Sequence, residues 1–359
     1  MLTIYPEKIK NFRSHRNPSF YLVVTPALSN QVSLQSTALY SECHTIVCEP
    51  QEDIDTLVKN KIPDHADIFF MPYWYPSIHF FPRRENLLPH QRFVAMPCSL
   101  ATPVNLHDIS YFLNVIYDTD PEELQSKVDN FFKTLGDSKT ITFINHEYDT
   151  SAVLNLNKDC LWTEICGHIH AGEIGIAPSA ELALTHVEFK NPHCSLDITG
   201  DLLLQGCPIL HVHDTQPSCR HQQSQLFTQL TSLQMGALKV TLVKGVIQHL
   251  EVLKAPAQIA CDAFEKLLAT TEAYRTLIEV GIGLHHRFRL VDGNKTMNET
   301  YGGDHQCVHF GMGAFGSTLY HLDVLCPATS LMSDAHRLLV GPGNERPSRR
   351  QGGYCPCEN

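Results

Sequence analysis

The sequence has little that would support binding to nucleic acids or membranes. It contains no block dense in lysine and arginine, and its 27 basic residues are outnumbered by 38 acidic ones, which gives a net charge of −11 with histidine neutral. Both kinds of partner are normally held by clustered positive charge, so neither is expected. No apolar run approaches the roughly 18 residues of a membrane-spanning helix, and the first twenty residues contain no signal-peptide core. We therefore expect a cytoplasmic protein with no nucleic-acid or membrane partner.

Several catalytic signatures are also missing. There is no glycine loop of the phosphate-binding type, no Gly-x-Ser-x-Gly elbow and no recognisable cysteine–histidine nucleophile arrangement. The 13 cysteines are odd in number, which argues against a closed set of disulfides and favours free thiols in a reducing compartment. Cys355 and Cys357 near the end of the chain have no second cysteine pair at structural-zinc spacing, so they are assigned no role.

What remains is typical of a folded protein with many potential metal ligands. Of the 359 residues, 43% are apolar and 18% are charged, which supports one large or two medium domains with a sizeable core. Histidine is abundant, at 21 residues. Histidines and carboxylates are the side chains from which many metal sites are built, but composition does not locate them.

The first third of the chain alternates predicted strands and helical segments. The strands are short apolar or β-branched runs, and the helical segments lie between them. This alternation predicts an open α/β domain over residues 1–137. The predicted strands are Ser19–Thr25, Thr45–Cys48, Asp67–Met71 and Arg92–Met96, and the predicted helices are Val32–Ser41 and Gln51–Lys61.

A helix over Pro121–Leu135 is predicted to end the first domain, since Asp120 can cap it and Gly136 can stop it. Beyond it the pattern becomes that of antiparallel strands, over Lys139–Ile144, Pro192–Leu204 and Ala237–Leu253, with one clear helix over Ile259–Thr276 that buries Ile259 among other apolar residues. We expect an α+β, largely antiparallel metal-binding domain over residues 138–340, followed by a flexible tail over 341–359.

The sharpest local feature is the segment Tyr320–Leu325. In a strand, side chains alternate between faces, so His321 and Asp323 share one face and can bind one divalent metal together. His309 lies twelve positions earlier in another strand-like segment, and a hairpin would bring it beside them. A hydrogen-bonded His–Asp pair or a solvated strand face remains open as the plainer interpretation.

Two glutamates stand in comparable settings. Glu173 lies between glycines in a stretch with few charges, and Glu279 is the one acid inside an apolar run. A buried charge is costly unless it is paired or bound to a metal, so each glutamate is either a ligand or satisfied by neighbouring donors. Together with His309, His321 and Asp323 they form the set that a two-metal hydrolytic site requires.

The order of these motifs resembles the aminopeptidase T family of thermophilic metallopeptidases, and more closely its shorter, leucyl-aminopeptidase-like members. The resemblance rests on Ala-Gly-Glu173-x-x-x-Ala-Pro, Glu279-Val-Gly-Ile-Gly, Val-His309-Phe-Gly-Met-Gly and His321-Leu-Asp323, over residues 138–332. It implies that these five residues are metal ligands, that Glu173 or Glu279 moves the proton, and that zinc, cobalt or magnesium is the cofactor. It further implies an aminopeptidase-like hydrolase of peptide or amide bonds that acts on short peptides as a homodimer. The short spacing between His309 and His321 and the many histidines near the ligands favour a specialised small substrate.

The shorter branch also includes the 2,5-dihydroxypyridine dioxygenase, which gives an alternative. In that case His309, His321 and Asp323 would hold one Fe(II) as a two-histidine, one-carboxylate triad. A tyrosine of the family's peptidases is replaced here by Phe315, which has no hydroxyl, so a non-catalytic, peptide-binding relative is a third hypothesis. We expect substrate contacts from Phe315 and from four histidines that lie near the ligands in sequence, namely His168, His170, His285 and His305. His211, in His211-Val-His213-Asp214, is interpreted as part of a polar loop outside the site.

Overall fold

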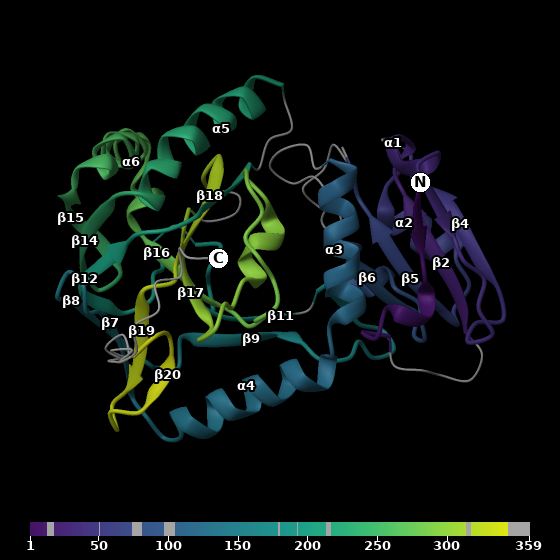
Figure 1. The fold of residues 1–359 in the computed structure, drawn as a ribbon, viewed down its shortest axis with the longest axis horizontal. Coiled ribbons are helices and arrows are strands. Elements are labelled where there is room, and N and C mark those ends of the chain that lie inside the picture. The colour runs from purple at the N-terminus through teal and green to yellow at the C-terminus, as the bar shows by residue number, and fades with distance from the viewer. Residues whose placement is uncertain are drawn as a thin grey trace, which may run out of the picture.

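The computed structural model describes residues 1–12, 18–49, 51–73, 81–96, 105–178, 180–191, 193–212, 217–313 and 317–343. Within these ranges the chain is a mixture of helices and strands, and the strands form a five-stranded parallel sheet, a separate parallel pair and two antiparallel sheets (Figure 1). None of the helices in these ranges has the length and hydrophobicity needed to cross a membrane.

The N-terminal part is a five-stranded parallel sheet with helices on both faces. Its strand order is β10-β6-β5-β2-β4, and a separate parallel pair joins β1 to β3. Apolar residues of α3 pack on one face of the sheet and those of α2 on the other, so both faces are buried. The strands are β1 (Leu2–Ile4), β2 (Ser19–Val24), β3 (Val32–Leu34), β4 (Cys43–Val47), β5 (Ala66–Met71), β6 (Arg92–Ala95) and β10 (Ile174–Ile176), and the helices are α1 (Pro26–Ser29), α2 (Ile54–Lys61) and α3 (Leu106–Asp118).

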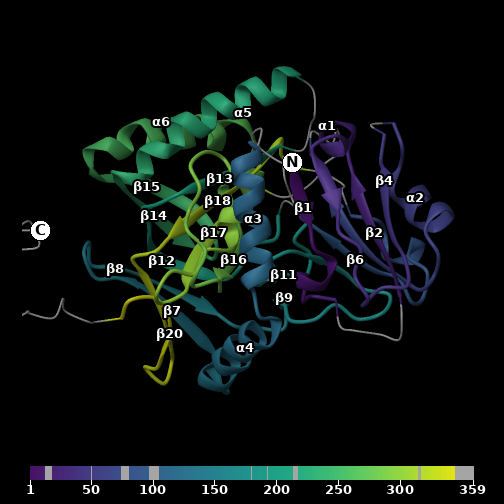
Figure 2. The same cartoon turned by 45° about the vertical axis from the view of Figure 1, so that its right-hand side comes forward.

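The remainder consists of two antiparallel sheets that share one large core, with α5 and α6 above them and α4 along β9 (Figures 1 and 2). The six-stranded sheet has the order β13-β18-β17-β16-β11-β9, and the seven-stranded sheet has the order β15-β14-β12-β8-β7-β19-β20. The strands of the first are β9 (Cys160–Cys166), β11 (Ala180–His186), β13 (Pro208–Val212), β16 (Leu277–Gly283), β17 (Cys307–Met312) and β18 (Tyr320–Cys326). Those of the second are β7 (Thr140–Asn145), β8 (Thr150–Asn155), β12 (Ile198–Leu204), β14 (Ala237–Val243), β15 (Val246–Lys254), β19 (Thr329–Ser333) and β20 (Leu338–Val340). The helices are α4 (Pro121–Leu135), α5 (Pro217–Leu230) and α6 (Gln258–Thr270), and short 3-10 turns cover Pro6–Lys8, Arg84–Asn86, Thr231–Gln234, Ala255–Ala257, Glu272–Arg275 and Thr296–Thr300.

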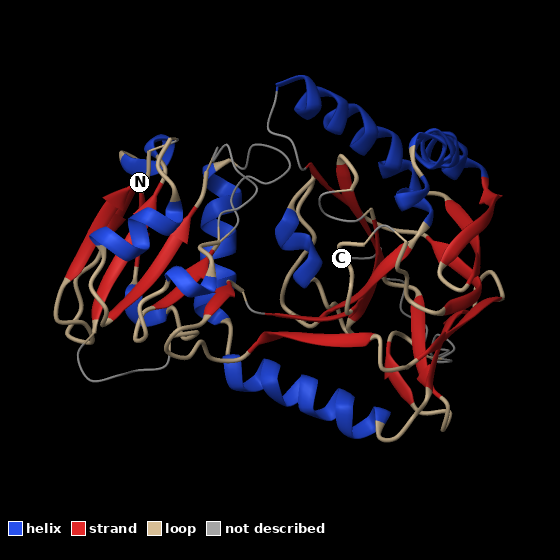
Figure 3. Cartoon of the chain, turned by 180° about the vertical axis from the view of Figure 1, so that it is seen from behind, coloured by secondary structure: helices blue, strands red, loops and turns tan. Residues whose placement is uncertain are grey.

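The mixed architecture agrees with an α/β part followed by an α+β part, and most predicted elements are confirmed (Figure 3). The helix over Pro121–Leu135 has the predicted bounds, with the Asp120 side chain accepting from the Glu122 backbone N–H and Gly136 following at φ +56°. The helix expected over Val32–Ser41 is wrong, because Val32–Leu34 pairs with β1 as a strand. Ile259 is 55% exposed rather than buried.

The boundary expected at residue 137 stays a prediction, because one strand links the two parts. β10 lies beyond that boundary in sequence but pairs with β6 in the N-terminal sheet, with Ile174 opposite Phe93. The segment that leads into β10 is held there too, since Gly172 donates its N–H to the Gln91 carbonyl. The chain therefore returns to the first sheet before it completes the antiparallel sheets. The tail expected beyond residue 340 lies mostly outside the described residues.

Candidate metal centre

Four of the five predicted ligands meet on one face of the six-stranded sheet. His321 and Asp323 come from β18, His309 from β17 and Glu279 from β16, which are adjacent strands. The residues between them in sequence, such as Leu322, point to the other face and pack in the large core. The alternation of the sequence therefore places the polar groups on one side and the core on the other.

Glu279 lies between the two histidines. Its Oε1 is 3.9 Å from Nε2 of His309, and its Oε2 is 3.5 Å from Nε2 of His321. His321 is also 3.2 Å from Asp323, measured from Nε2 to Oδ2. In the register of β17 and β18, His309 is opposite Leu325, which is four residues from His321. The backbones of the two histidines are therefore about 13 Å apart along the strand direction. Their imidazoles approach the carboxylate of Glu279 from two sides, each next to a different oxygen.

Three further residues extend the cluster, and none of them was predicted. Glu181 on β11 places Oε1 at 3.3 Å from Nε2 of His309. His211 on β13 lies 2.6 Å from Oε1 of Glu299 and 3.6 Å from Oδ2 of Asp323, measured from its Nε2. Glu181 carries the same signal as Glu279, a lone acid in an apolar strand, and His211 carries the alternating pattern that identified His321. Glu299, on a 3-10 turn, has no comparable signal.

Glycines on the neighbouring strands make room for these side chains. Gly281 lies opposite His309 in the register of β16 and β17, and a Cβ atom there would overlap the imidazole of His309. Gly311 lies between Glu279 on one side and Asp323 on the other, and an added Cβ would contact both. The glycines in the segments that carry Glu279 and His309 are therefore needed to make room for the side chains of the cluster.

The buried charges of the cluster shift one another strongly. Burial disfavours a charged imidazole, but the surrounding carboxylates outweigh it and hold the pKa values of His309 and His321 well above their ordinary range. Burial also opposes the charge of Glu279, yet the two neighbouring histidines stabilise its carboxylate and lower its pKa to about 2. At Glu181 burial dominates and raises the pKa to about 7. Without a metal, the histidines therefore hold protons that a bound cation would displace.

The donor set fits divalent metal ions. Its ligand atoms form three groups, each with one imidazole and two carboxylates, and these groups share Glu279 and Asp323: Glu181–Glu279–His309, Glu279–His321–Asp323 and His211–Glu299–Asp323. Oδ1 of Asp323 and Nδ1 of His309 are buried without a hydrogen-bond partner among the described residues. A buried carboxylate oxygen with no partner is costly, and a cation would satisfy it.

A cavity of about 420 Å³ opens onto this cluster. Its lining combines carboxylates and His321 of the cluster with apolar residues. The apolar residues are Phe81, Ile165 on β9, which lies beside Glu181 in the sheet, and Ile174, Gly175 and Ile176 on β10. The strand that returns to the N-terminal sheet therefore lines the same cavity as the metal-binding residues.

Glu173 does not belong to the cluster. Its carboxylate accepts a hydrogen bond of 2.8 Å from the backbone N–H of His170, and its own carbonyl accepts from the N–H of Phe93 on the N-terminal sheet. It is absent from the ligand groups and from the lining of the cavity. The structure therefore does not bring Glu173 together with the other four predicted ligands, because the backbone of this segment is fixed by β6 and not by the metal-binding sheet.

The histidines expected to contact substrate also lie elsewhere. Nδ1 of His168 is 3.0 Å from the carbonyl of Lys10, and His170 is exposed. His285 is buried with Nε2 at 2.8 Å from the hydroxyl of Thr119, and burial lowers its pKa to about 4. None of these lines the 420 Å³ cavity. Phe315 lies outside the described residues.

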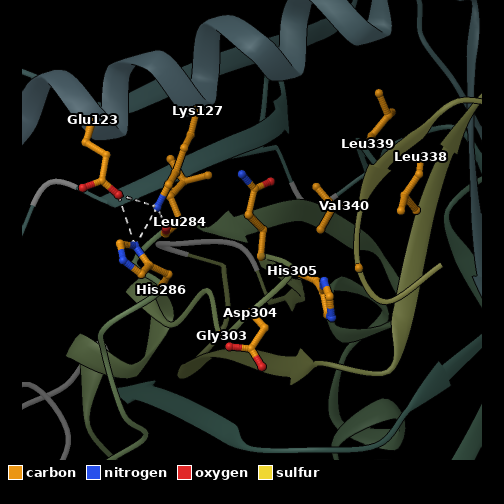
Figure 4. A pocket seen from close by; sticks show the side chains of 12 residues that line it. Glu123, Lys127, Leu284, His286, Gly303, Asp304, His305, Leu338, Leu339 and Val340 are labelled. Atoms are coloured by element: carbon orange, nitrogen blue, oxygen red, sulfur yellow. Dashed lines mark hydrogen bonds and ion pairs between the residues drawn. The ribbon is translucent and has the colours of Figure 1, made fainter. Parts of the chain in front are cut away.

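His305 lines a second cavity of about 540 Å³ (Figure 4). There Lys127 on α4 lies 2.9 Å from Nδ1 of His286 and 3.3 Å from Oε1 of Glu123. The expectation that His305 contacts the substrate of the metal site therefore has no support in its position.

Comparisons with known proteins show which fold this chain has and which family it belongs to. The structure is similar to that of 2,5-dihydroxypyridine dioxygenase from Pseudomonas putida KT2440, with a TM-score of 0.52 and 12% identity over 89% of each chain, which shows a shared fold. AmpT from Thermus thermophilus aligns with a TM-score of 0.43 and 10% identity over 91% of this chain and 93% of that one. No curated protein matches the sequence. Residues 57–333, well over half of the chain, match the family model described as crocagin biosynthetic protein CgnE/B, and the chain therefore belongs to that family.

Proposed function

We propose that this protein is a metal-dependent hydrolase that acts on a peptide or amide bond of a specialised small substrate. The observation that carries the proposal is the overlap of the three ligand groups at Glu279 and Asp323. Carboxylates shared between neighbouring groups are the arrangement that holds two cations close together. The four carboxylates of the cluster also balance the charge of two divalent ions when the histidines are neutral.

The side chains of the cluster can take different roles in hydrolysis. Two divalent ions bound here would polarise a carbonyl group and make a water molecule nucleophilic near neutral pH. Glu181 and Glu279 both line the cavity, so a carboxylate oxygen faces the substrate and can accept and return a proton. His309 lies next to both carboxylates and His321 lies next to that of Glu279, so the two histidines hold these carboxylates in place.

The cavity favours a substrate with an apolar group next to the reacting bond. Its apolar lining consists of Phe81 and the aliphatic side chains of Ile165, Ile174 and Ile176. Burying such a group contributes about 25 cal/mol for each Å² removed from water. Because these four side chains are uncharged, we infer that this part of the cavity selects by shape and hydrophobicity. A homodimer, as the resemblance implies, stays a prediction.

A mononuclear Fe(II) dioxygenase is the second candidate, since the cluster contains both histidines and the aspartate of such a triad. That chemistry needs two imidazoles and one carboxylate at one ion. His309 and His321 approach different oxygens of Glu279, although His211 and His321 both approach Oδ2 of Asp323, at 3.6 and 3.2 Å. The hydrolase is favoured because the cluster contains four carboxylates, whereas a triad at one Fe(II) uses one.

Activity assays can separate these candidates. The protein is loaded with zinc, cobalt or magnesium in one arm and anaerobically with Fe(II) in another, and Asp323→Ala serves as the inactive control. The hydrolase predicts release of amine from apolar dipeptides or amides in the first arm. Oxygen uptake with hydroxypyridines or catechols in the second arm would contradict it, and saturable peptide binding without turnover in any arm would indicate a non-catalytic relative.

A further inference from the structure

A second group of potential metal ligands lies on the surface of the N-terminal sheet, away from the cluster. Asp64 and His65 immediately precede β5, and His90 lies two residues before β6, which is the parallel neighbour of β5 (Figure 1). One ligand atom from each of the three side chains falls within 4.8 Å of the others. Both histidines are exposed, and Asp64 is partly exposed. We propose that Asp64, His65 and His90 form a binding site for one divalent transition-metal ion.

The two histidines are brought together by the register of the sheet. Asp67 on β5 is directly opposite Arg92 on β6, so His65 and His90 each lie two residues before a matched pair. That pair is a buried ion pair with two hydrogen bonds of 2.6 and 2.8 Å, which locks the register. As a result the two imidazole rings stack, with centroids 4.5 Å apart and planes inclined by 25°.

A buried glutamine fixes the loops that carry these ligands. The side-chain amide of Gln91 donates to the carbonyls of Val58, Ile62 and Pro63, at 2.9, 3.0 and 3.2 Å. The segment that leads into Asp64 is thereby tied to the residue that follows His90. Since little backbone has to be ordered when a cation binds, the site is preorganised.

The carboxylate is already oriented towards the imidazoles. Asp64 accepts the backbone N–H of His90 at Oδ1, at 2.9 Å, and its Oδ2 lies 2.7 Å from Nδ1 of the same residue. A carboxylate that is hydrogen-bonded to the backbone keeps its orientation when a metal is bound. Imidazole and carboxylate donors together suit zinc, nickel or copper, with water completing the coordination. A cation here would join the segments before β5 and β6.

Equilibrium dialysis against zinc, followed by metal analysis, tests this site in the full-length chain. The background is His309→Ala/His321→Ala, which weakens the central cluster as a zinc site. The added substitutions are His65→Ala or His90→Ala, and the matched control is His44→Ala, an exposed histidine that also lies 2.8 Å from a carboxylate, that of Glu42. We expect each of the first two to remove about one equivalent of zinc and the control to remove none. Equal zinc content in all variants would overturn the proposal.

A measurement on the unsubstituted protein guards against folding defects in the variants. Diethyl pyrocarbonate modifies exposed imidazoles, and peptide mass spectrometry gives the extent of modification of each histidine. We expect zinc to slow the modification of His65 and His90 but not that of His44. Equal rates with and without zinc at all three positions would refute the site.

Discussion

Replacing Glu181 by glutamine tests which glutamate serves the metal centre. Glu173 provides the matched control, because sequence reasoning favoured it while the structure places it outside the cluster. Glutamine has the shape of glutamate and keeps a carbonyl acceptor, so both Glu181→Gln and Glu173→Gln preserve hydrogen bonding. The exchange at Glu181 reduces the four carboxylates of the cluster to three. Two divalent ions would then leave one positive charge uncompensated in a buried site.

The size of the effect follows from the charge that is lost. Two unit charges 4 Å apart attract by about 4 kcal/mol at an effective dielectric constant near 20, and the smaller desolvation cost of a neutral amide offsets part of this. We therefore expect Glu181→Gln to weaken zinc binding by ~10- to 100-fold, a loss of about 1.4–2.7 kcal/mol of binding free energy. Glu173→Gln should leave binding unchanged. Competitive titration with a chromophoric chelator, in a His65→Ala/His90→Ala background, measures both. A larger loss for Glu173→Gln than for Glu181→Gln would refute the assignment.

Three further predictions concern the support of the site and of the fold. Gly281→Ala should displace the imidazole of His309, cost about 1–3 kcal/mol by overpacking and lower the bound metal; an unchanged metal content would contradict the close approach. Burial lowers the pKa of His285 to about 4, so between about pH 6.5 and pH 4 the unfolded chain binds more protons than the folded one. The free energy of unfolding should therefore fall by up to about 3 kcal/mol as the pH drops through that window. Urea unfolding should show a smaller fall in His285→Gln, and an equal fall would be the contrary result. Arg92→Met should destabilise the fold by about 3–5 kcal/mol, because Asp67 is left buried without its cation; in chemical denaturation Asp67→Asn/Arg92→Met should recover part of that loss, and a double variant no more stable than Arg92→Met would argue against the explanation.

The sequence predicts the centre of the site well, because local patterns determine it. The alternation of His321 and Asp323 on a strand and the isolation of Glu279 in an apolar run are properties of short segments, and the structure has both. A hairpin was enough to predict that His309 would join them, and β17 and β18 pair in that way.

The sequence predictions differ from the structure where a segment pairs with a strand that is distant in sequence. Val32–Leu34 is a strand because β1 pairs with it, and nothing within the segment indicates that partner. Glu173 was assigned to the metal site on its glycine-rich surroundings, but those glycines shape a connection to β6. His211 has the alternating pattern of a strand histidine, yet only its pairing opposite His321 shows that it reaches the site.

The number of metal ions held by the central cluster tests the account most directly. The protein carrying His65→Ala/His90→Ala is purified anaerobically, saturated with zinc and freed of excess metal, and the metal is then counted against protein. We predict about two ions per chain, falling by at least one when His321→Ala/Asp323→Ala is added. A single tightly bound iron as purified with no second ion on saturation, or a zinc content that the added pair of substitutions leaves unchanged, would contradict the two-metal centre.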